Sequence, residues 1–301
     1  MEELSPKISV VVPSYNQGSY IEETILSIIK QNYPKLELII IDGGSTDNSV
    51  EIIKKYSSFI NYFISEKDNG QAHALNKGFA KASGDLCAYL NSDDCYLDNI
   101  FWKIRDFYLK NKFNWIYSDV LIGKSIDQSQ YFTSQIVSFE SFCVEQTIGQ
   151  QGVFWQNNPF KKPWFDESLK YVIDHKFFIN LYKNFGPPKY LSKTGAFFRI
   201  HQDSKTSKYE KILYKERRQI SLEFARLANS KFQRKNIELE LKRLELKIEA
   251  HKKYVLILSK SKFTEKLLCF FSILIIFLKA PFKLRDRIFL GYLKKSLISL
   301  K

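Results

Sequence analysis

The sequence has few cysteines, and their spacing does not suit a metal site. It holds four in 301 residues, none in a CxxC pair: Cys87, Cys95, Cys143 and Cys269. This pattern argues against a zinc site and a disulfide framework, and it suits a reducing compartment. The first residues, MEELSPK, also lack the apolar segment of a secretory signal. We therefore expect a cytoplasmic protein.

An apolar run of membrane-spanning length is also missing near the C-terminus. Residues 267–278 (LLCFFSILIIFL) form a 12-residue apolar run, which at 1.5 Å per residue is too short for a hydrocarbon core of about 30 Å. The residues that follow mix large apolar groups with Lys and Arg, as a membrane-surface helix does. A helical cap on the main domain, or an oligomer contact, is the alternative.

Acidic residues are scarce in the last third of the chain. Residues 202–301 hold 25 Lys and Arg against 10 Asp and Glu, whereas residues 1–201 hold 21 against 22. A near-neutral body with a basic tail predicts two regions, a main domain at 1–205 and a helical, basic region at 206–301. An anionic membrane surface is the expected partner of the tail. No nucleic-acid-binding motif accompanies its charges, so no nucleic acid is expected.

Apolar runs and helical patterns alternate along the first half of the sequence. This alternation predicts an α/β fold, with a mostly parallel, Rossmann-like sheet flanked by helices. Strands are predicted at residues 8–12, 36–41, 59–64, 86–90, 115–122, 152–155 and 190–200, and helices at 21–29, 50–56, 72–82 and 172–184. Ligands bind beyond the carboxyl ends of such strands. Four loops should therefore open on one crevice: residues 13–16, 42–44, 66–70 and 91–94.

Two adjacent carboxylates, Asp93 and Asp94, follow the strand predicted at residues 86–90. Like charges repel, and carboxylates lose hydration at the end of a buried strand. A divalent cation would relieve this conflict. A surface turn would also do so, since the preceding Asn91 and Ser92 are common turn residues.

Four segments in this order resemble the family 2 glycosyltransferases with a GT-A fold. They are VVPSYNQGSYIEETILSI, LELIIIDGGSTDNS, DNGQAHALNKGFAKASGD and YLNSDD, and the resemblance extends over residues 7–201. It implies a nucleotide-sugar donor, Mn²⁺ or Mg²⁺ as cofactor, and transfer of a hexosyl or related sugar with inversion at the anomeric carbon. The basic tail lies outside the resemblance.

The resemblance also nominates a donor site. Asp42 matches the family's base-binding Asp, or it forms a turn with Gly43 and Gly44. Lys77 reaches a phosphate, or it is a solvated helical lysine. The alternative for Asn16 is a simple loop exit, and the alternative for Asp68 is a tight turn. The predicted nucleotide-sugar-binding residues are Pro13, Tyr15, Asn16, Asp42, Asp68, Lys77, Asn91 and Asp93.

Asn91 stands where the family's Asp-x-Asp motif has its first Asp. One carboxylate suffices for Mg²⁺ or Mn²⁺ when diphosphate oxygens and water complete the coordination. We expect Asp93 to be the direct metal ligand and Asp94 its support. His201 either meets the metal or serves as a structural hydrogen-bonding residue.

The segment FDESLKYVIDHKFFINL resembles the part of the family that carries the catalytic base, and the matching residue is Asp174. A helix-start carboxylate stabilised by the helix dipole is the alternative. Ile173 and Lys176 replace residues that are often acidic in the family. The segment GQQGVFWQ, residues 149–156, resembles the family's acceptor-side strand and offers amides and aromatics suited to sugar hydroxyls and ring faces; a place in the core is the alternative for Trp155.

Two functions follow. The first is a metal-dependent inverting glycosyltransferase, peripheral at the cytoplasmic face of a membrane, that acts on a glycan or lipid-linked acceptor in polysaccharide or cell-surface glycan assembly. The second is a non-catalytic module that binds a nucleotide sugar or a membrane surface on a degenerate transferase domain. The second function is supported by three departures from the family's pattern, at Asn91, Ile173 and Lys176.

Overall fold

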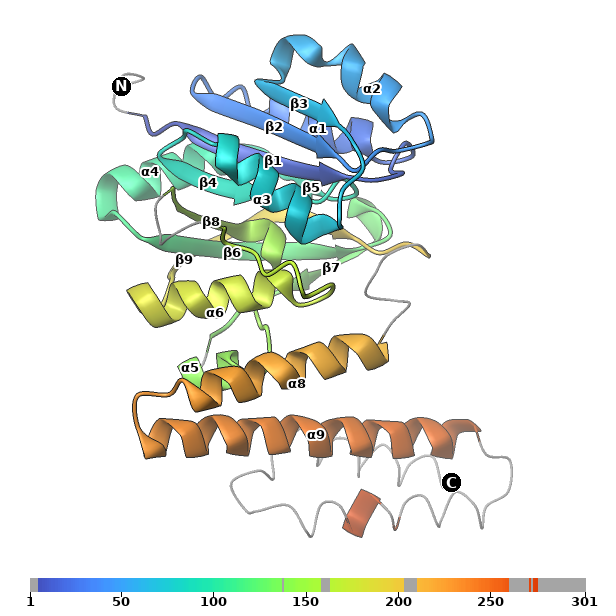
Figure 1. Cartoon of the computed structure of the whole chain (residues 1–301), viewed down its shortest axis with the longest axis vertical. Coiled ribbons are helices and arrows are strands. Elements are labelled where there is room, and N and C mark those ends of the chain that lie inside the picture. The colour runs from blue at the N-terminus through green and yellow to red at the C-terminus, as the bar shows by residue number, and fades with distance from the viewer. Residues whose placement is uncertain are drawn as a thin grey trace. The chain divides into compact units, whose positions relative to one another are not determined.

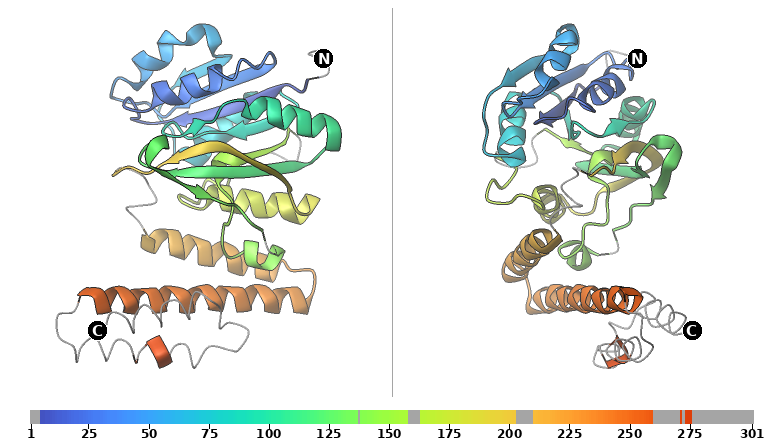
Figure 2. Two further views of the ribbon diagram at one scale, coloured as in Figure 1. Left: turned by 180° about the vertical axis from the view of Figure 1, so that it is seen from behind. Right: turned by 90° about the vertical axis from the view of Figure 1, so that its right-hand side faces the viewer.

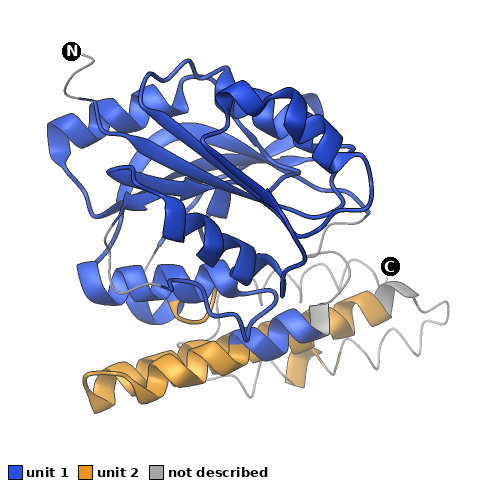
Figure 3. Cartoon of the chain, turned by 45° about the horizontal axis from the view of Figure 1, so that its top comes forward, with its two compact units in different colours: residues 1–142, 146–217 blue, residues 143–145, 218–301 orange. Residues whose placement is uncertain are grey.

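A computed structural model of the chain describes residues 5–136, 138–157, 163–202, 210–259, 271 and 273–275 (Figure 1). The chain divides into two compact units, one of residues 1–142 and 146–217 and the other of residues 143–145 and 218–301 (Figure 3). The first unit ends at Arg217, inside a helix, whereas the sequence placed a boundary after residue 205. That assignment of domains stays a prediction.

The first unit is built on a nine-stranded sheet. Its strand order is β3-β2-β1-β4-β8-β6-β9-β5, and β7 pairs with β6. The strands are β1 (Ile8–Ser14), β2 (Leu36–Asp42), β3 (Tyr62–Ser65), β4 (Leu86–Tyr89), β5 (Cys95–Tyr96), β6 (Trp115–Gly123), β7 (Ser129–Phe132), β8 (Val153–Gln156) and β9 (Lys189–Arg199). β1 to β4 run parallel, as do β6 and β9, whereas β5, β7 and β8 pair antiparallel with their neighbours.

Helices cover both faces of this sheet (Figure 2), so the predicted α/β fold is confirmed. The helices of the first unit are α1 (Ile21–Ile29), α2 (Ser49–Lys55), α3 (Gln71–Lys81), α4 (Ile100–Asn111), α5 (Phe139–Phe142), α6 (Ile173–Phe185) and the start of α8 (Glu210–Arg226). Successive residues of a strand point to opposite faces. Val10 and Val12 therefore join the apolar core that includes residues of α1, α2 and α4, while Val11 faces α3.

The approach of α3 to β1 depends on a glycine. A Cβ at Gly78 would lie 2.4 Å from Cγ1 of Val11, far inside van der Waals contact. Hydrogen at this position brings α3 close to the sheet and so places the loop before α3 near the carboxyl ends of β1 and β2.

The second unit holds the rest of α8 and α9 (Lys231–Ser259). Ile220 and Phe224 of α8 are buried, as are Ile237 and Leu241 of α9. The predicted helical character of the tail is confirmed over Glu210–Arg226 and Lys231–Ser259. Across the described part of the chain, no helix has both the length and the apolar character required to cross a bilayer. The apolar run at 267–278 lies outside the described residues except at 271 and 273–275.

Candidate functional site

The loops that follow β1, β2, β3 and β4 line one cavity of about 580 Å³, which we call the loop cavity. Parallel strands bring their carboxyl ends to the same edge of the sheet, so these loops lie side by side. Of the predicted donor-binding residues, the structure brings together Pro13, Tyr15, Asp68, Asn91 and Asp93. Asn16, Asp42 and Lys77 are not among the described residues that line the cavity.

Asn16 and Asp42 are engaged with the loop after β2. The Asn16 side-chain oxygen accepts a hydrogen bond of 2.8 Å from the backbone N–H of Thr46. Asp42 is fully buried, and its carboxylate accepts hydrogen bonds from the N–H groups of Gly44 and Ser45 and from the hydroxyl of Ser65. These contacts make Asp42 a turn-forming residue, while its role in base recognition stays a prediction.

The loop after β3 supplies two charged side chains to the loop cavity, Lys67 and Asp68. Asp68 accepts a 2.8 Å hydrogen bond from the N–H of Gly70, and its carboxylate lies against Gly43, where a Cβ would be 2.8 Å from Oδ2. Lys67 lines the cavity beside it and had not been singled out from the sequence. Lys77, which had been, forms a 2.9 Å ion pair with Glu66.

Asp93 and Asp94 occupy different environments. The Asp93 side chain is 18 % exposed and lines the loop cavity. Asp94 is fully buried, where it accepts hydrogen bonds from the N–H of Arg199 at 2.9 Å and the amide of Gln151 at 2.8 Å. Burial and the adjacent charge of Asp93 raise the pKa of Asp94. Asp93 is thus the carboxylate of the pair that faces the loop cavity.

Asp93 and His201 form a pair that suits a divalent cation. His201 Nε2 lies 2.9 Å from Asp93 Oδ2, and the His201 ring packs against Tyr20 with a centroid distance of 4.6 Å. Carboxylate oxygen and imidazole nitrogen are both ligands of Mn²⁺. Among the described residues, no three His, Cys, Asp or Glu side chains converge on one point. A cation held here would therefore complete its coordination with diphosphate oxygens and water.

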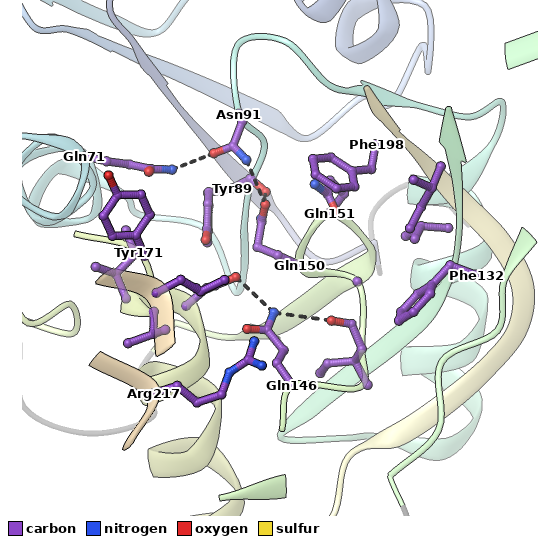
Figure 4. Close-up of a pocket in the computed structure, with 18 of the residues that line it drawn as sticks. Gln71, Tyr89, Asn91, Phe132, Gln146, Gln150, Gln151, Tyr171, Phe198 and Arg217 are labelled. Atoms are coloured by element: carbon purple, nitrogen blue, oxygen red, sulfur yellow. Dashed lines mark hydrogen bonds between the residues drawn. The ribbon is translucent and has the colours of Figure 1, made fainter. Parts of the chain in front are cut away.

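Asn91 and Gln71 line the loop cavity and also a second cavity of about 390 Å³, which we call the Asp174 cavity (Figure 4). Gln71 Nε2 donates to Asn91 Oδ1 at 2.7 Å, and Asn91 Nδ2 donates to Gln150 Oε1 at 3.3 Å. Phe198 of β9 is also common to both cavities. The two cavities therefore adjoin along a wall of amide and aromatic side chains.

Asp174 lies in the first turn of α6, on the Asp174 cavity. Its Oδ2 accepts a 2.9 Å hydrogen bond from Gln146, and its Oδ1 accepts one of 2.8 Å from the N–H of His175. Burial raises the pKa of Asp174, although these two donors act in the opposite direction. A carboxylate with a raised pKa is a stronger proton acceptor, which suits a general base.

The start of α6 is held by a residue of α8. The Glu216 carboxylate, in a residue only 8 % exposed, accepts hydrogen bonds from the N–H groups of residues 170, 171 and 172 at 2.9, 2.8 and 3.3 Å. Sequence reasoning missed Glu216 and its neighbour Arg217, which lines the Asp174 cavity. Both lie in a charged stretch that was predicted only as part of the helical, basic region at 206–301. The amide-rich segment at 149–156, in contrast, did indicate Gln150 and Gln151.

Comparison with known sequences relates the chain to sugar transferases. The model of Glycosyl transferase family 2 matches residues 9–158. The chain is 31 % identical over 189 residues to the glycosyltransferase GlyG of Streptococcus pneumoniae, covering 59 % of this chain and 61 % of that protein. It is 26 % identical over 214 residues to the poly(ribitol-phosphate) beta-N-acetylglucosaminyltransferase TarS of Staphylococcus aureus, covering 64 % of this chain and 35 % of TarS. The chain thus spans less than two thirds of either relative.

Comparison with solved structures supports the same fold. The crystal structure of Staphylococcus aureus TarS 1-349 in complex with UDP-GlcNAc aligns with a TM-score of 0.67 at 19 % identity. The alignment covers 98 % of this chain and 89 % of that one. At this identity the likeness establishes the fold alone, and it is the GT-A fold that the sequence predicted.

Proposed function

Because the chain belongs to glycosyltransferase family 2, we propose that it transfers a sugar from a nucleotide-diphosphate sugar to a hydroxyl group of an acceptor glycan. The wall shared by the two cavities carries this proposal. Gln71, Asn91 and Phe198 line both, so a donor in the loop cavity would present its sugar to Asp174. TarS is named for transfer of N-acetylglucosamine to poly(ribitol-phosphate), and this supports a place in polysaccharide or cell-surface glycan assembly.

The donor end of the reaction belongs to the loop cavity. Tyr15, which is 59 % exposed at its rim, offers a ring face to the base. Lys67 offers a positive charge to the diphosphate. Asp93 and His201 would hold Mn²⁺ or Mg²⁺, and such an ion supplies further positive charge to the departing nucleotide diphosphate.

The acceptor end belongs to Asp174. In the proposed reaction, its carboxylate takes the proton of the acceptor hydroxyl while that oxygen attacks the anomeric carbon from the side opposite the leaving nucleotide. The new glycosidic bond forms as the bond to the diphosphate breaks, so the anomeric configuration inverts. Gln146 holds the carboxylate toward the cavity through its 2.9 Å hydrogen bond.

The membrane location is a proposal from charge. The last 100 residues hold 25 basic and 10 acidic side chains, which favours adsorption to anionic lipid at the cytoplasmic face. A lipid-linked glycan would then be within reach of the enzyme.

The test is a donor screen. Nucleotide release is measured for UDP-, GDP- and dTDP-sugars with and without Mn²⁺, using wild-type protein and the Asp174→Asn variant. We expect one donor class to turn over in a metal-dependent way, and Asp174→Asn to lower the rate by about 100- to 10,000-fold while nucleotide affinity stays unchanged.

Two results would contradict the proposal. Unchanged turnover in Asp174→Asn would show that Asp174 is not the catalytic base. Tight nucleotide binding by the wild type with no turnover of any donor would instead favour the non-catalytic module, for which Asn91 and Lys176 gave the first indication. Glu167→Gln, an exposed position outside both cavities, is the matched control for carboxylate loss.

A further inference from the structure

A buried phenol, that of Tyr89, lines the Asp174 cavity. Alternate residues of β4 point to opposite faces of the sheet. Ala88 and Leu90 join the apolar core, so Tyr89 points to the other face. There its ring packs edge-on against Phe165 with a centroid distance of 5.6 Å, and the residue is only 2 % exposed. Figure 4 shows its hydroxyl oxygen directed toward the side of the cavity where Gln146 lies.

The Tyr89 hydroxyl is unpaired, whereas the amides beside it are engaged. Gln146 donates to Asp174 at 2.9 Å, and Gln150 donates to the backbone carbonyl of Tyr89 at 2.8 Å. Within the part of the chain that the structure describes, no group forms a hydrogen bond with the phenol oxygen of Tyr89. A buried O–H without a partner is unfavourable. A ligand in the cavity can supply the missing partner.

The phenol of Tyr89 and the carboxylate of Asp174 are complementary groups on one cavity. Burial, with smaller contributions from nearby charges that include Asp174, raises the pKa of Tyr89 well above its ordinary value. The phenol therefore keeps its proton and can donate it to a hydrogen bond, whereas an ionised carboxylate only accepts. Asp174 takes its own hydrogen bonds from Gln146 and the N–H of His175. A ligand between Asp174 and Tyr89 thus meets an acceptor and a donor.

Building on the proposed transferase function, we propose that the acceptor presents two hydroxyl groups on adjacent carbons, and that Tyr89 selects it by donating a hydrogen bond to the hydroxyl beside the reactive one. Asp174 receives the proton of the reactive hydroxyl, and the Tyr89 O–H bonds the oxygen of its neighbour. An acceptor that lacks this neighbour leaves the phenol unpaired. A site built to bond a hydroxyl discriminates strongly against such an analogue. Tyr89 is therefore a specificity-determining residue.

The experiment compares methyl glycosides with their singly deoxygenated analogues. Nucleotide release is recorded with the donor that the screen identifies, first with methyl glycosides of the common hexoses and N-acetylhexosamines, then with each monodeoxy form of the best acceptor. The deoxygenation that abolishes transfer identifies the reactive position. Removal of the hydroxyl next to it should lower the wild-type kcat/KM by about 10- to 100-fold. Tyr89→Phe should show a similar loss on the complete glycoside and no further loss on the deoxy compound.

Tyr33→Phe is the matched control for loss of a buried phenol. Tyr33 is 5 % exposed, and its hydroxyl donates to the carbonyl of Pro6 at 2.6 Å. It is not among the described residues that line either cavity. Tyr33→Phe should therefore lower the unfolding temperature and leave the discrimination between acceptors unchanged. Tyr89→Phe removes an unpaired hydroxyl, so its unfolding temperature should stay the same or rise.

Equal turnover of the complete and the deoxygenated glycoside by the wild type would overturn the inference. So would wild-type discrimination in Tyr89→Phe, or an equal loss on both compounds, because Tyr89 would then act on the reactive hydroxyl or through Asp174. Failure of every glycoside to raise nucleotide release above hydrolysis by water would likewise refute a diol site. Absence of turnover with any donor is a different result: it refutes the transferase function itself, and the inference falls with it.

Discussion

Glu37 is a carboxylate at the amino end of β2, the opposite end from Asp42, and it shows how one buried charge depends on its neighbours. Its side chain is 9 % exposed. Its carboxylate accepts hydrogen bonds from the ammonium of Lys7 at 2.6 Å, from the N–H of Ser83 at 2.8 Å and from the hydroxyl of Ser9. Burial alone would raise its pKa, but these donors together lower the pKa of Glu37 to about 2.

This pKa predicts a loss of stability in acid. A carboxyl whose pKa is lower in the folded than in the unfolded state stabilises the fold above the unfolded pKa. That contribution disappears as pH falls from about 4.5 to about 2, at a cost of roughly 3 kcal/mol in the free energy of unfolding. Urea unfolding between pH 6 and pH 2.5 would measure it. Glu37→Gln should flatten this dependence, while Glu51→Gln, exposed on α2, should leave it unchanged; the same slope in both variants would contradict the assignment.

At the scale of elements, α3 can approach β1 only because position 78 has no side chain. Gly78→Ala should lower the free energy of unfolding by about 1–3 kcal/mol through overpacking against Val11, although alanine is the better helix former. Ala80→Gly, on the exposed side of the same helix, should cost about 1 kcal/mol through helix propensity alone. Thermal denaturation of both variants tests this prediction. An increase in the stability of Gly78→Ala would contradict it, because β1 would then have shifted to accommodate the added methyl group.

The contact between α8 and the start of α6 yields a second prediction. Glu216→Ala leaves three N–H groups without their acceptor, one buried and two partly buried, so we expect the free energy of unfolding to fall by about 1–3 kcal/mol. Because residues 170–172 precede Asp174, turnover should fall while nucleotide affinity stays unchanged. Glu238→Gln, in an exposed ion pair of α9, should stay within about 0.5 kcal/mol of wild type. Unchanged turnover in Glu216→Ala would show that Glu216 contributes to the stability of the fold and does not position Asp174.

The accuracy of the sequence-based prediction differs from one strand to the next. The ends of the apolar runs fixed β1, β2 and β4 to within two residues of the observed strands, because Pro, Gly and Asp punctuate buried strands clearly. The third strand was predicted at 59–64 and lies at Tyr62–Ser65, since Phe59 ends a short 3-10 helix instead.

The part of the site that escaped prediction comes from long-range contacts. Asp42, Asp93 and Asp174 follow apolar runs or begin a helix, so local pattern and resemblance indicated them. Glu216 acts on backbone N–H groups 44 to 46 residues earlier in the chain. Its own surroundings, KERRQ, look like any solvated helix. No local pattern reveals such a pairing.

For the whole molecule, the strongest signal is the uneven charge. Residues 1–201 are nearly neutral and residues 202–301 hold an excess of 15 positive charges. Each basic group near an anionic bilayer contributes about 1 kcal/mol of attraction, and this falls with ionic strength. A chain with this distribution should adsorb to an anionic membrane by its C-terminal part.

Removal of residues 260–301 should therefore release the protein from vesicles that contain phosphatidylserine. Co-sedimentation at low salt would show wild-type protein bound, and binding should decline as salt is raised toward 0.5 M because the Debye length shortens. A full-length variant separates charge from apolar insertion, with Gln in place of Lys283, Arg285, Arg287, Lys294 and Lys295. If charge dominates, this variant should detach as the truncation does. Continued binding of the truncated protein would refute the membrane assignment, and salt-resistant binding of the full-length variant would assign it to the apolar residues.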